Sequence, residues 1–309
     1  MSRKLLALVA LGALGIAAAG CLPEEPNTDP STGGTSSSTG GTSSSGGTSS
    51  GGKATGGTAT GGRATGGTAT GGKATGGTNT ATGGTGTTQL FSFFVTSLAA
   101  MQQLSGNTNG FGGDLRYGMT SGLDGADKIC QTIATNEGFG NKTWRAFLST
   151  TTGVNAIDRV GSGPWYDRLG RLVATGVSGL IAGNRPDGVA AVVNDLPNEK
   201  GVQEHTANAA YDDHDTLTGS NTQGRLYSTT LGSTCNDWTS AVGSTGRPMA
   251  GHHWPGGPSQ NWIQAHTMNG CAPGVCTTQA GAGCSTACPS GGVGCSGGYG
   301  AIYCFALTP

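Results

Sequence analysis

The sequence predicts a small α+β domain at the end of a long low-complexity segment. Three observations predict it: an apolar run at 91–95 that indicates a strand, a helical pattern at 124–136, and a closing apolar run at 301–307. Between 150 and 300 the apolar segments are short and are interrupted by Gly, Asn and Asp, so loops dominate. One main helix, a loop-rich middle and strands at both ends are typical of an α+β domain.

Residues 1–21 are typical of an export signal. Two basic residues precede an apolar stretch at 5–17, and small residues then lead to Cys21. The ending Ala-Ala-Gly-Cys resembles the lipobox of bacterial lipoproteins, in which cleavage leaves a lipid-modified N-terminal cysteine. The resemblance implies lipidation of Cys21 and a lipid-anchored protein of the bacterial cell envelope. Leu22 favours the outer membrane, and an ordinary secretory signal with an incidental cysteine is the alternative.

Residues 22–88 are rich in Gly, Ser and Thr, and from Gly51 they repeat every five residues. The repeat offers no apolar side chains that could stack into a solenoid, so we expect a disordered tether. A flexible chain of this length has a root-mean-square reach of roughly 45 Å. Such a tether would hold the following domain clear of a surface.

Residues 89–309 are numerous enough to bury one sizeable core. In the predicted helix, Ala126, Ile129, Cys130 and Ile133 recur at helical spacing, and Asp124 is the expected N-cap. Alternating side chains at 144–149 indicate a further strand.

The chain has nine cysteines, and all but Cys21 lie after residue 88. An even number of cysteines in an exported domain predicts disulfides. Zinc bound by the cysteines between 271 and 295 is the competing interpretation, and the absence of a histidine pair at the usual spacing argues against it. The eight are Cys130, Cys235, Cys271, Cys276, Cys284, Cys288, Cys295 and Cys304.

An ordered set of short segments carries a family resemblance over residues 91–306. The segments are Phe94 to Ser97, Gly122 to Gln131, Trp144 to Ser149, Ala156 to Arg159, Leu217 to Ser220, Cys235 to Thr239 and Ile302 to Phe305. Together they resemble a bacterial lipoprotein family of unknown function with a C-type-lectin-like fold, distantly related to endostatin. The resemblance implies that the first and last strands lie side by side with the helix packed beneath them.

The same resemblance implies particular disulfides. It pairs Cys130 with Cys304, and it pairs Cys235 with a cysteine shortly before the last strand, either Cys271 or Cys295. The remaining four cysteines would then staple an insert near 271–295, which departs from the usual pattern of the family.

The stretch 195–215 is strongly acidic. Hard cations such as calcium bind to several carboxylate and carbonyl oxygens, and Asp212, Asp213 and Asp215 are therefore a candidate calcium site. A solvated acidic loop without a cation is the simpler alternative.

Candidate ligand-binding residues come from partial matches to sugar-binding lectins and from aromatic residues. The pattern Leu-Pro-Asn at 196–198 and the pair Asn236–Asp237 resemble parts of the lectin calcium and sugar site, without its usual Glu. Trp254 and Trp262 lie near His252, His253 and His266, where the rings could stack on sugars and the histidines could bind a metal. Burial of the tryptophans in the core is the alternative. The candidates are Asn198, Asn236, Asp237, Trp254 and Trp262.

These patterns predict a surface-displayed, lipid-anchored binding module for a glycan or protein, without catalytic residues. A formal net charge of −1 gives no reason to expect nucleic acid as a partner. A metal-dependent envelope hydrolase is an alternative, and it requires Asp212, Asp213, His214 and His252 to meet in space. A structural surface-coat protein is a third possibility.

Overall fold

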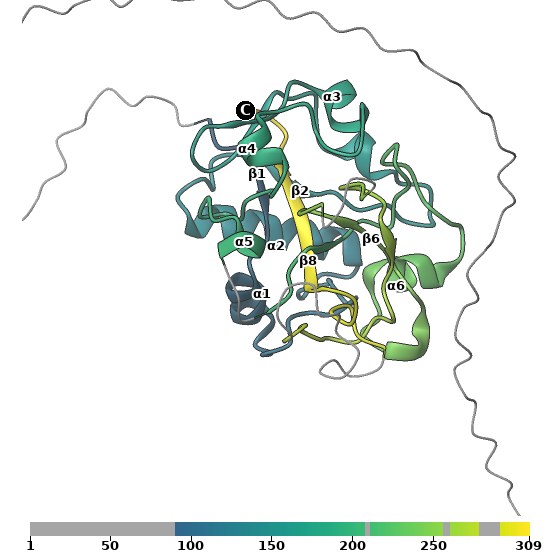
Figure 1. Ribbon diagram of the computed structural model, residues 1–309. Helices are drawn as coiled ribbons and strands as arrows, with labels where there is room; N and C mark the ends of the chain where they lie inside the picture. Colours follow the sequence, from purple (N-terminus) through teal and green to yellow (C-terminus); the bar gives the residue numbers. More distant parts are fainter. Residues whose placement is uncertain (1–89, 208–210, 256–259, 278–290) are drawn as a thin grey trace, which may run out of the picture. The chain divides into compact units, whose positions relative to one another are not determined.

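The computed structural model describes residues 90–207, 211–255, 260–277 and 291–309 (Figure 1). The predicted signal peptide with Cys21, the tether, Cys284 and Cys288 lie outside the described residues. Within the described part, no helix has the length and apolar character needed to cross a membrane.

The centre of the fold is β8 (Gly298–Ala306), a nine-residue strand that is buried along its whole length (Figure 1, yellow). β1 (Phe93–Val95) pairs with it antiparallel, so the first and last strands of the domain do lie side by side. β2 (Trp144–Ala146) pairs with the same end of β8 on the opposite edge, and β5 (Asp215–Leu217) pairs parallel to its beginning.

The sheet continues from β5 to two short strands. β6 (Met249–His252) pairs antiparallel with β5, and β7 (His266–Thr267) pairs antiparallel with β6. The resulting order is β1-β8-β5-β6-β7, with β2 beside β8. Mixed pairing with only a few helices makes the described part an α+β fold, as the sequence predicts.

The main helix, α2 (Gly122–Asn136), buries the apolar stripe that the sequence predicts and packs against β2 and β8. The prediction that Asp124 is its N-cap is wrong. Ser121 is the cap, because its hydroxyl accepts from the backbone N–H of Asp124 at 3.1 Å and also donates to the Asp124 carboxylate. A serine hydroxyl suits this position as well as a carboxylate does.

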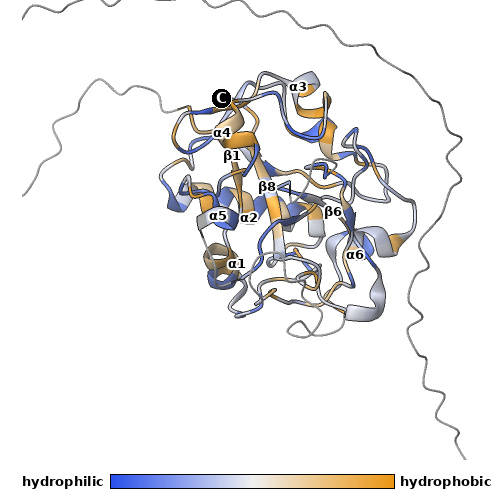
Figure 2. Cartoon of the chain, viewed as in Figure 1, coloured by the Kyte–Doolittle hydropathy of each residue, from blue (hydrophilic) through white to orange (hydrophobic). Residues whose placement is uncertain are grey.

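Aromatic side chains fill the core around β1, β2 and β8. The hydropathy colouring is apolar along β1 and part of β8 (Figure 2). Phe305 lies 4.9 Å from Phe93 and 5.3 Å from Trp165, measured between ring centroids. Trp144 and Trp238 are buried as well. This packing fixes β8, whose first residues lead into the site described below.

Short elements occupy the long middle of the chain. They comprise α1 (Leu98–Ser105), β3 (Trp165–Tyr166), β4 (Leu172–Ala174), α3 (Val177–Ile181), α4 (Ala190–Val193), α5 (Glu204–Ala207) and 3-10 turns at Ala156–Arg159, Leu231–Thr234 and Gly243–Thr245. The element α6 (Cys235–Trp238) is a left-handed turn, with φ of 50°, 58°, 52° and 65°. Asp237 stabilises it by accepting from the Thr151 backbone N–H and the Thr234 hydroxyl.

Two disulfides are defined within the described residues. Cys130 on α2 is bonded to Cys304 on β8, which confirms the pairing that the family resemblance implies. Cys235 is bonded to Cys271, which resolves the choice between Cys271 and Cys295. Cys276 and Cys295 are disulfide-bonded as well, so the described cysteines of the insert offer no free thiolate for zinc.

Candidate metal centre

All five histidines of the chain lie in one polar region beside β5, β6 and β7. Sheet register brings three ligand-bearing positions together. Asp215 pairs with His252, and Ala250 pairs with His266. Side chains two residues apart on a strand share a face, and paired positions do so as well, so Asp215, His252 and His266 lie on the same face of this edge.

His214 is next to Asp215 in sequence and would normally point to the opposite face of a strand. It precedes β5, however, and the pairing of β5 with β8 is irregular between Asp215 and Thr216. The backbone N–H groups of His214 and Asp215 both donate to the Gly297 carbonyl, at 2.9 and 2.8 Å. Irregular pairing of this kind re-aims side chains, and here it allows two neighbouring residues to reach one point.

The Asp215 carboxylate is the hub of the cluster. Its Oδ1 lies 3.0 Å from His266 Nε2, 3.1 Å from His252 Nε2 and 3.7 Å from His214 Nε2. One ligand atom from each of the four residues falls within 4.8 Å of every other. Side chains of Asp215 and His252 are almost fully buried, whereas that of His266 is 34% exposed and leads to solvent.

These separations fit a tetrahedral metal ion. Zinc bonds of about 2.0–2.1 Å to nitrogen and oxygen imply about 3.3 Å between ligand atoms at tetrahedral angles. The three distances from Asp215 Oδ1 bracket that value. In addition, both Asp215 oxygens and both His252 ring nitrogens are buried without a hydrogen-bond partner. Buried polar atoms are costly unless something satisfies them, and a metal ion at the centre of the cluster would do so for Asp215 and for one nitrogen of His252.

The charges in the cluster perturb each other strongly. Burial alone would raise the pKa of Asp215, but the imidazoles of His252 and His266 outweigh it and hold the pKa below its ordinary range. Burial would lower the pKa values of His214 and His266, yet the carboxylates of Asp212 and Asp215 raise the first and Asp215 raises the second. The carboxylates of the cluster therefore favour positive charge beside Asp215.

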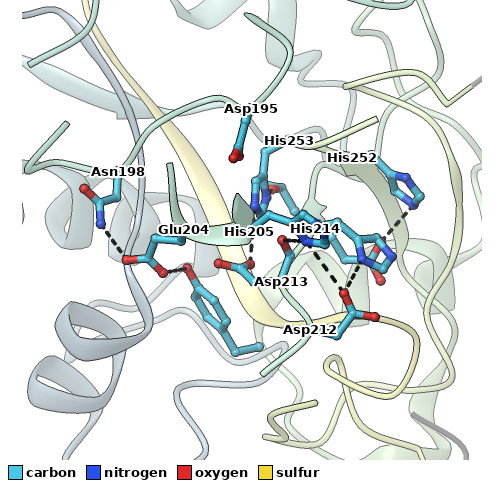
Figure 3. A network of polar contacts seen from close by, with 12 residues as sticks. Asp195, Asn198, Glu204, His205, Asp212, Asp213, His214, His252 and His253 are labelled. Atoms are coloured by element: carbon cyan, nitrogen blue, oxygen red, sulfur yellow. Dashed lines mark hydrogen bonds and ion pairs between the residues drawn. The ribbon is translucent and has the colours of Figure 1, made fainter. Parts of the chain in front are cut away.

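A second layer of polar contacts surrounds the four residues, and Figure 3 shows the part of it near His214 and His252. The Asp212 carboxylate accepts from His214 Nδ1 at 2.8 Å. His205 bonds through Nδ1 to the Asp213 carbonyl at 2.9 Å, and its ring stacks on Trp254 at 3.7 Å between centroids. Arg185 donates to the backbone carbonyls of His252 and His253 and so holds the end of β6 in place.

Asp213 and His253 lie on the inner side of this layer and are fully buried. His253 Nε2 is 3.4 Å from Asp213 Oδ1, and His253 Nδ1 is 3.0 Å from the Thr216 hydroxyl. Burial, reinforced by the nearby Glu204, raises the pKa of Asp213. Burial, reinforced by the charges of His214 and Arg185, lowers the pKa of His253. Because both side chains are buried and neither belongs to a candidate metal cluster of the described residues, we assign them a structural role beneath the site.

The structure separates the three aspartates predicted to bind calcium. Asp212 faces His214, Asp213 faces His253, and Asp215 faces three imidazoles. Among the described residues, each cluster able to hold a metal contains a single aspartate and at least two histidines. Nitrogen ligands suit zinc and its neighbours, whereas calcium takes oxygen ligands. The donor set thus favours a different metal from the one predicted.

The structure also separates the predicted ligand-binding residues. Trp262 is fully buried, with its indole N–H donating to the Leu180 carbonyl, so its ring is part of the core and presents no face to a sugar. Trp254 is half-buried beside the metal cluster, where it stacks on His205.

The three polar candidates stabilise local turns. Asn198 is buried, accepts from two backbone N–H groups at its own turn and donates to Glu204. Asp237 holds the left-handed turn, and Asn236 is exposed and donates to the Thr239 hydroxyl. These residues therefore belong to separate hydrogen-bond networks.

The alternative of a hydrolase requires Asp212, Asp213, His214 and His252 to meet. Asp212, His214 and His252 do lie together, whereas Asp213 faces His253 instead. The rings of His214 and His252 are 4.6 Å apart, and Asp212 contacts His214. Sequence reasoning does not connect Asp215 and His266 to this set. The sequence feature that could have indicated this cluster is the confinement of all five histidines to residues 205–266.

Comparison of the sequence with protein-family models and with curated proteins finds no match for this chain.

Proposed function

We propose that this chain is a zinc-binding protein, with His214, Asp215, His252 and His266 as the ligands. One observation carries the proposal: three imidazole Nε2 atoms lie 3.0, 3.1 and 3.7 Å from a single carboxylate oxygen that has no hydrogen-bond partner. Imidazole and carboxylate ligands suit zinc, copper and nickel, and zinc is the ion that most readily accepts four such ligands in a tetrahedron.

The ion would have a structural role in this arrangement. Four protein ligands close a tetrahedral site, whereas a catalytic zinc keeps a position for water or substrate. The ligands come from β6, β7 and the beginning of β5, so a bound ion would cross-link three neighbouring strands. We therefore propose that zinc holds together the polar edge of an exported binding module.

The cellular setting belongs to the same proposal. The lipobox resemblance at Cys21 supports a lipid-anchored protein of the cell envelope. The pairing of β1 with β8 and the Cys130–Cys304 disulfide agree with what a C-type-lectin-like fold implies. We propose that such a domain, held on its tether, presents a surface to a glycan or protein outside the cell.

The test is metal binding by the full chain with its disulfides formed. We expect one equivalent of zinc per chain by isothermal titration and elemental analysis, and no saturable binding of calcium at the same concentrations. Asp215→Asn and His266→Ala should each weaken zinc binding at least tenfold. Gln264→Ala is the matched control because Gln264 lies two residues before His266 and its side-chain oxygen accepts from the Thr222 backbone N–H. Undetectable zinc binding by the wild-type chain would refute the proposal.

A metal-dependent hydrolase is the second candidate, because three of the four residues that it requires, Asp212, His214 and His252, converge. It needs one protein ligand to give way to water, and the partly exposed His266 is the one nearest to solvent. The zinc-loaded chain should then hydrolyse activated esters or peptides, and His266→Ala should increase the rate by opening a position. Equal rates for the zinc-loaded and zinc-free chains would remove this candidate.

A further inference from the structure

We propose that Asp212 is a positioning residue for the metal centre: it holds His214 in the tautomer whose Nε2 lone pair faces the metal. This inference rests on the proposed function, since it concerns one ligand of the same site. Asp212 offers no ligand atom to the cluster around Asp215. Its effect would be exerted through His214.

The contact between the two residues is short and shielded. His214 Nδ1 lies 2.8 Å from Asp212 Oδ1, and the Asp212 side chain is only 2% exposed. A neutral imidazole carries one N–H, and a carboxylate beside Nδ1 fixes the proton there because an ionised carboxylate can only accept. The lone pair then resides on Nε2, the atom that lies 3.7 Å from Asp215 Oδ1.

The backbone keeps both residues in place. The N–H of Asp212 donates to the Cys276 carbonyl at 3.0 Å, and the N–H of His214 donates to the Gly297 carbonyl at 2.9 Å. Gly297 also lies directly against the imidazole, because a Cβ at this position would be 2.0 Å from His214 Cε1. The ring is therefore confined between the Asp212 carboxylate and the backbone of Gly297.

The other two histidine ligands lack such a partner. His252 Nδ1 has no hydrogen-bond partner in the described part of the chain. His266 Nδ1 makes a long hydrogen bond of 3.4 Å to a backbone oxygen, the Thr267 carbonyl. Within the described residues, His214 is thus the one ligand of the three that a carboxylate orients. Carboxylates that orient metal-binding histidines typically contribute 10- to 100-fold to metal affinity.

The first test measures zinc affinity by competition with a chromogenic chelator, using the full chain. We expect Asp212→Ala to weaken binding about 10- to 100-fold. Asp212→Asn retains an oxygen acceptor, so we expect it to recover part of that loss. Asp195→Asn is the matched control, because Asp195 is also buried and bonds to Thr206 instead of a metal ligand. In cobalt-loaded protein, Asp212→Ala should shift the visible absorption bands, and the control should leave them unchanged.

The second test needs no substitution. Long-range proton–nitrogen NMR of the metal-free wild-type chain, at alkaline pH where imidazoles are neutral, should show the His214 proton on Nδ1. With only five histidines, assignment is direct. A proton on Nε2, or a zinc affinity of Asp212→Ala within twofold of wild type, would overturn the positioning role. Failure of the wild-type chain to bind zinc would instead overturn the proposed function.

Discussion

Different interactions stabilise the two ends of the sheet: apolar packing at one end, and contacts between charged and polar groups at the other. Around β1, β2 and the end of β8, the buried side chains are mainly aromatic rings that pack on one another, as in the contact of Phe93 with Phe305 at 4.9 Å. Around β5, β6 and β7, the buried groups are imidazoles and carboxylates. Apolar burial stabilises the first region under any ionic condition. The second region needs counter-charges, so its stability should depend on metal and pH.

The two regions also make different contributions to the position of the candidate metal site. The apolar region, with the Cys130–Cys304 disulfide, sets the position of β8. The polar region then uses the beginning of β8 as a platform, because Gly297 accepts from both His214 and Asp215. A well-packed core thus allows a second region of the same sheet to bury charged side chains.

The largest expected effect comes from removing the disulfide of the apolar region. Its cysteines are 174 residues apart, and a loop of that length corresponds to about 5 kcal/mol of unfolding free energy on the chain-entropy model. We expect Cys130→Ser with Cys304→Ser to lose most of that amount in urea unfolding, with or without zinc. As the control, Cys235→Ser with Cys271→Ser should lose less, about 4 kcal/mol, because its loop is 36 residues long.

Zinc should stabilise the polar region by a smaller amount. At about 100 times the dissociation constant, a ligand that binds only the folded state contributes about 2.7 kcal/mol. We expect zinc to raise the Tm of the full chain by roughly 5–10 °C and a chelator to reverse the rise. Calcium at the same concentration should leave Tm unchanged. An equal shift with calcium would favour the acidic-loop interpretation over the histidine cluster.

Gly297→Ala tests the close contact between the backbone of Gly297 and the His214 ring. Gly297 has a φ of 147°, which residues with a side chain rarely adopt, and a methyl group at this position would lie 2.0 Å from His214 Cε1. We expect a loss of about 1–3 kcal/mol from overpacking, together with weaker zinc binding because the imidazole is displaced. Gly138→Ala is the control for a substitution at positive φ, since a methyl group there would meet no atom within 4 Å. Wild-type zinc affinity in Gly297→Ala would show that the ring tolerates the displacement.

The smallest effect should be a pH dependence of the zinc-induced shift. The pKa values of His214 and His266 lie above the ordinary histidine value, so zinc must displace more protons as the pH falls. Without metal, the ion pairs of these histidines stabilise the fold at pH values below about 6.5, and that contribution is lost as pH rises through the raised pKa values. Both effects make the zinc-induced rise in Tm larger at pH 8 than at pH 6. A constant shift over this range, measured calorimetrically, would contradict the proposed ligands.

The apolar region is the more predictable one from sequence. The helical spacing of Ala126, Ile129 and Ile133 and the apolar run before the C-terminus specify α2 and β8 directly. The cap of α2 is harder to predict because Ser121 and Asp124 are both good caps, and only the fold decides which hydroxyl or carboxylate meets the free N–H groups.

The site is less predictable, because its ligands follow no local spacing. His252 and His266 are separated from Asp215 by long loops, and the register between β5, β6 and β7 brings them together. The acidic residues are plain in the sequence, but they indicate calcium there because nothing local shows that each carboxylate faces an imidazole.

The irregular pairing between Asp215 and Thr216 has a consequence for folding fidelity. It allows two consecutive residues to meet at one ion, and a slip of one residue in β5 would turn Asp215 to the other face of the sheet. Four ligand atoms then coincide only in the correct alignment of β5, β6 and β7. The bound metal content of a refolded preparation would therefore measure the fraction of molecules whose strands are correctly aligned.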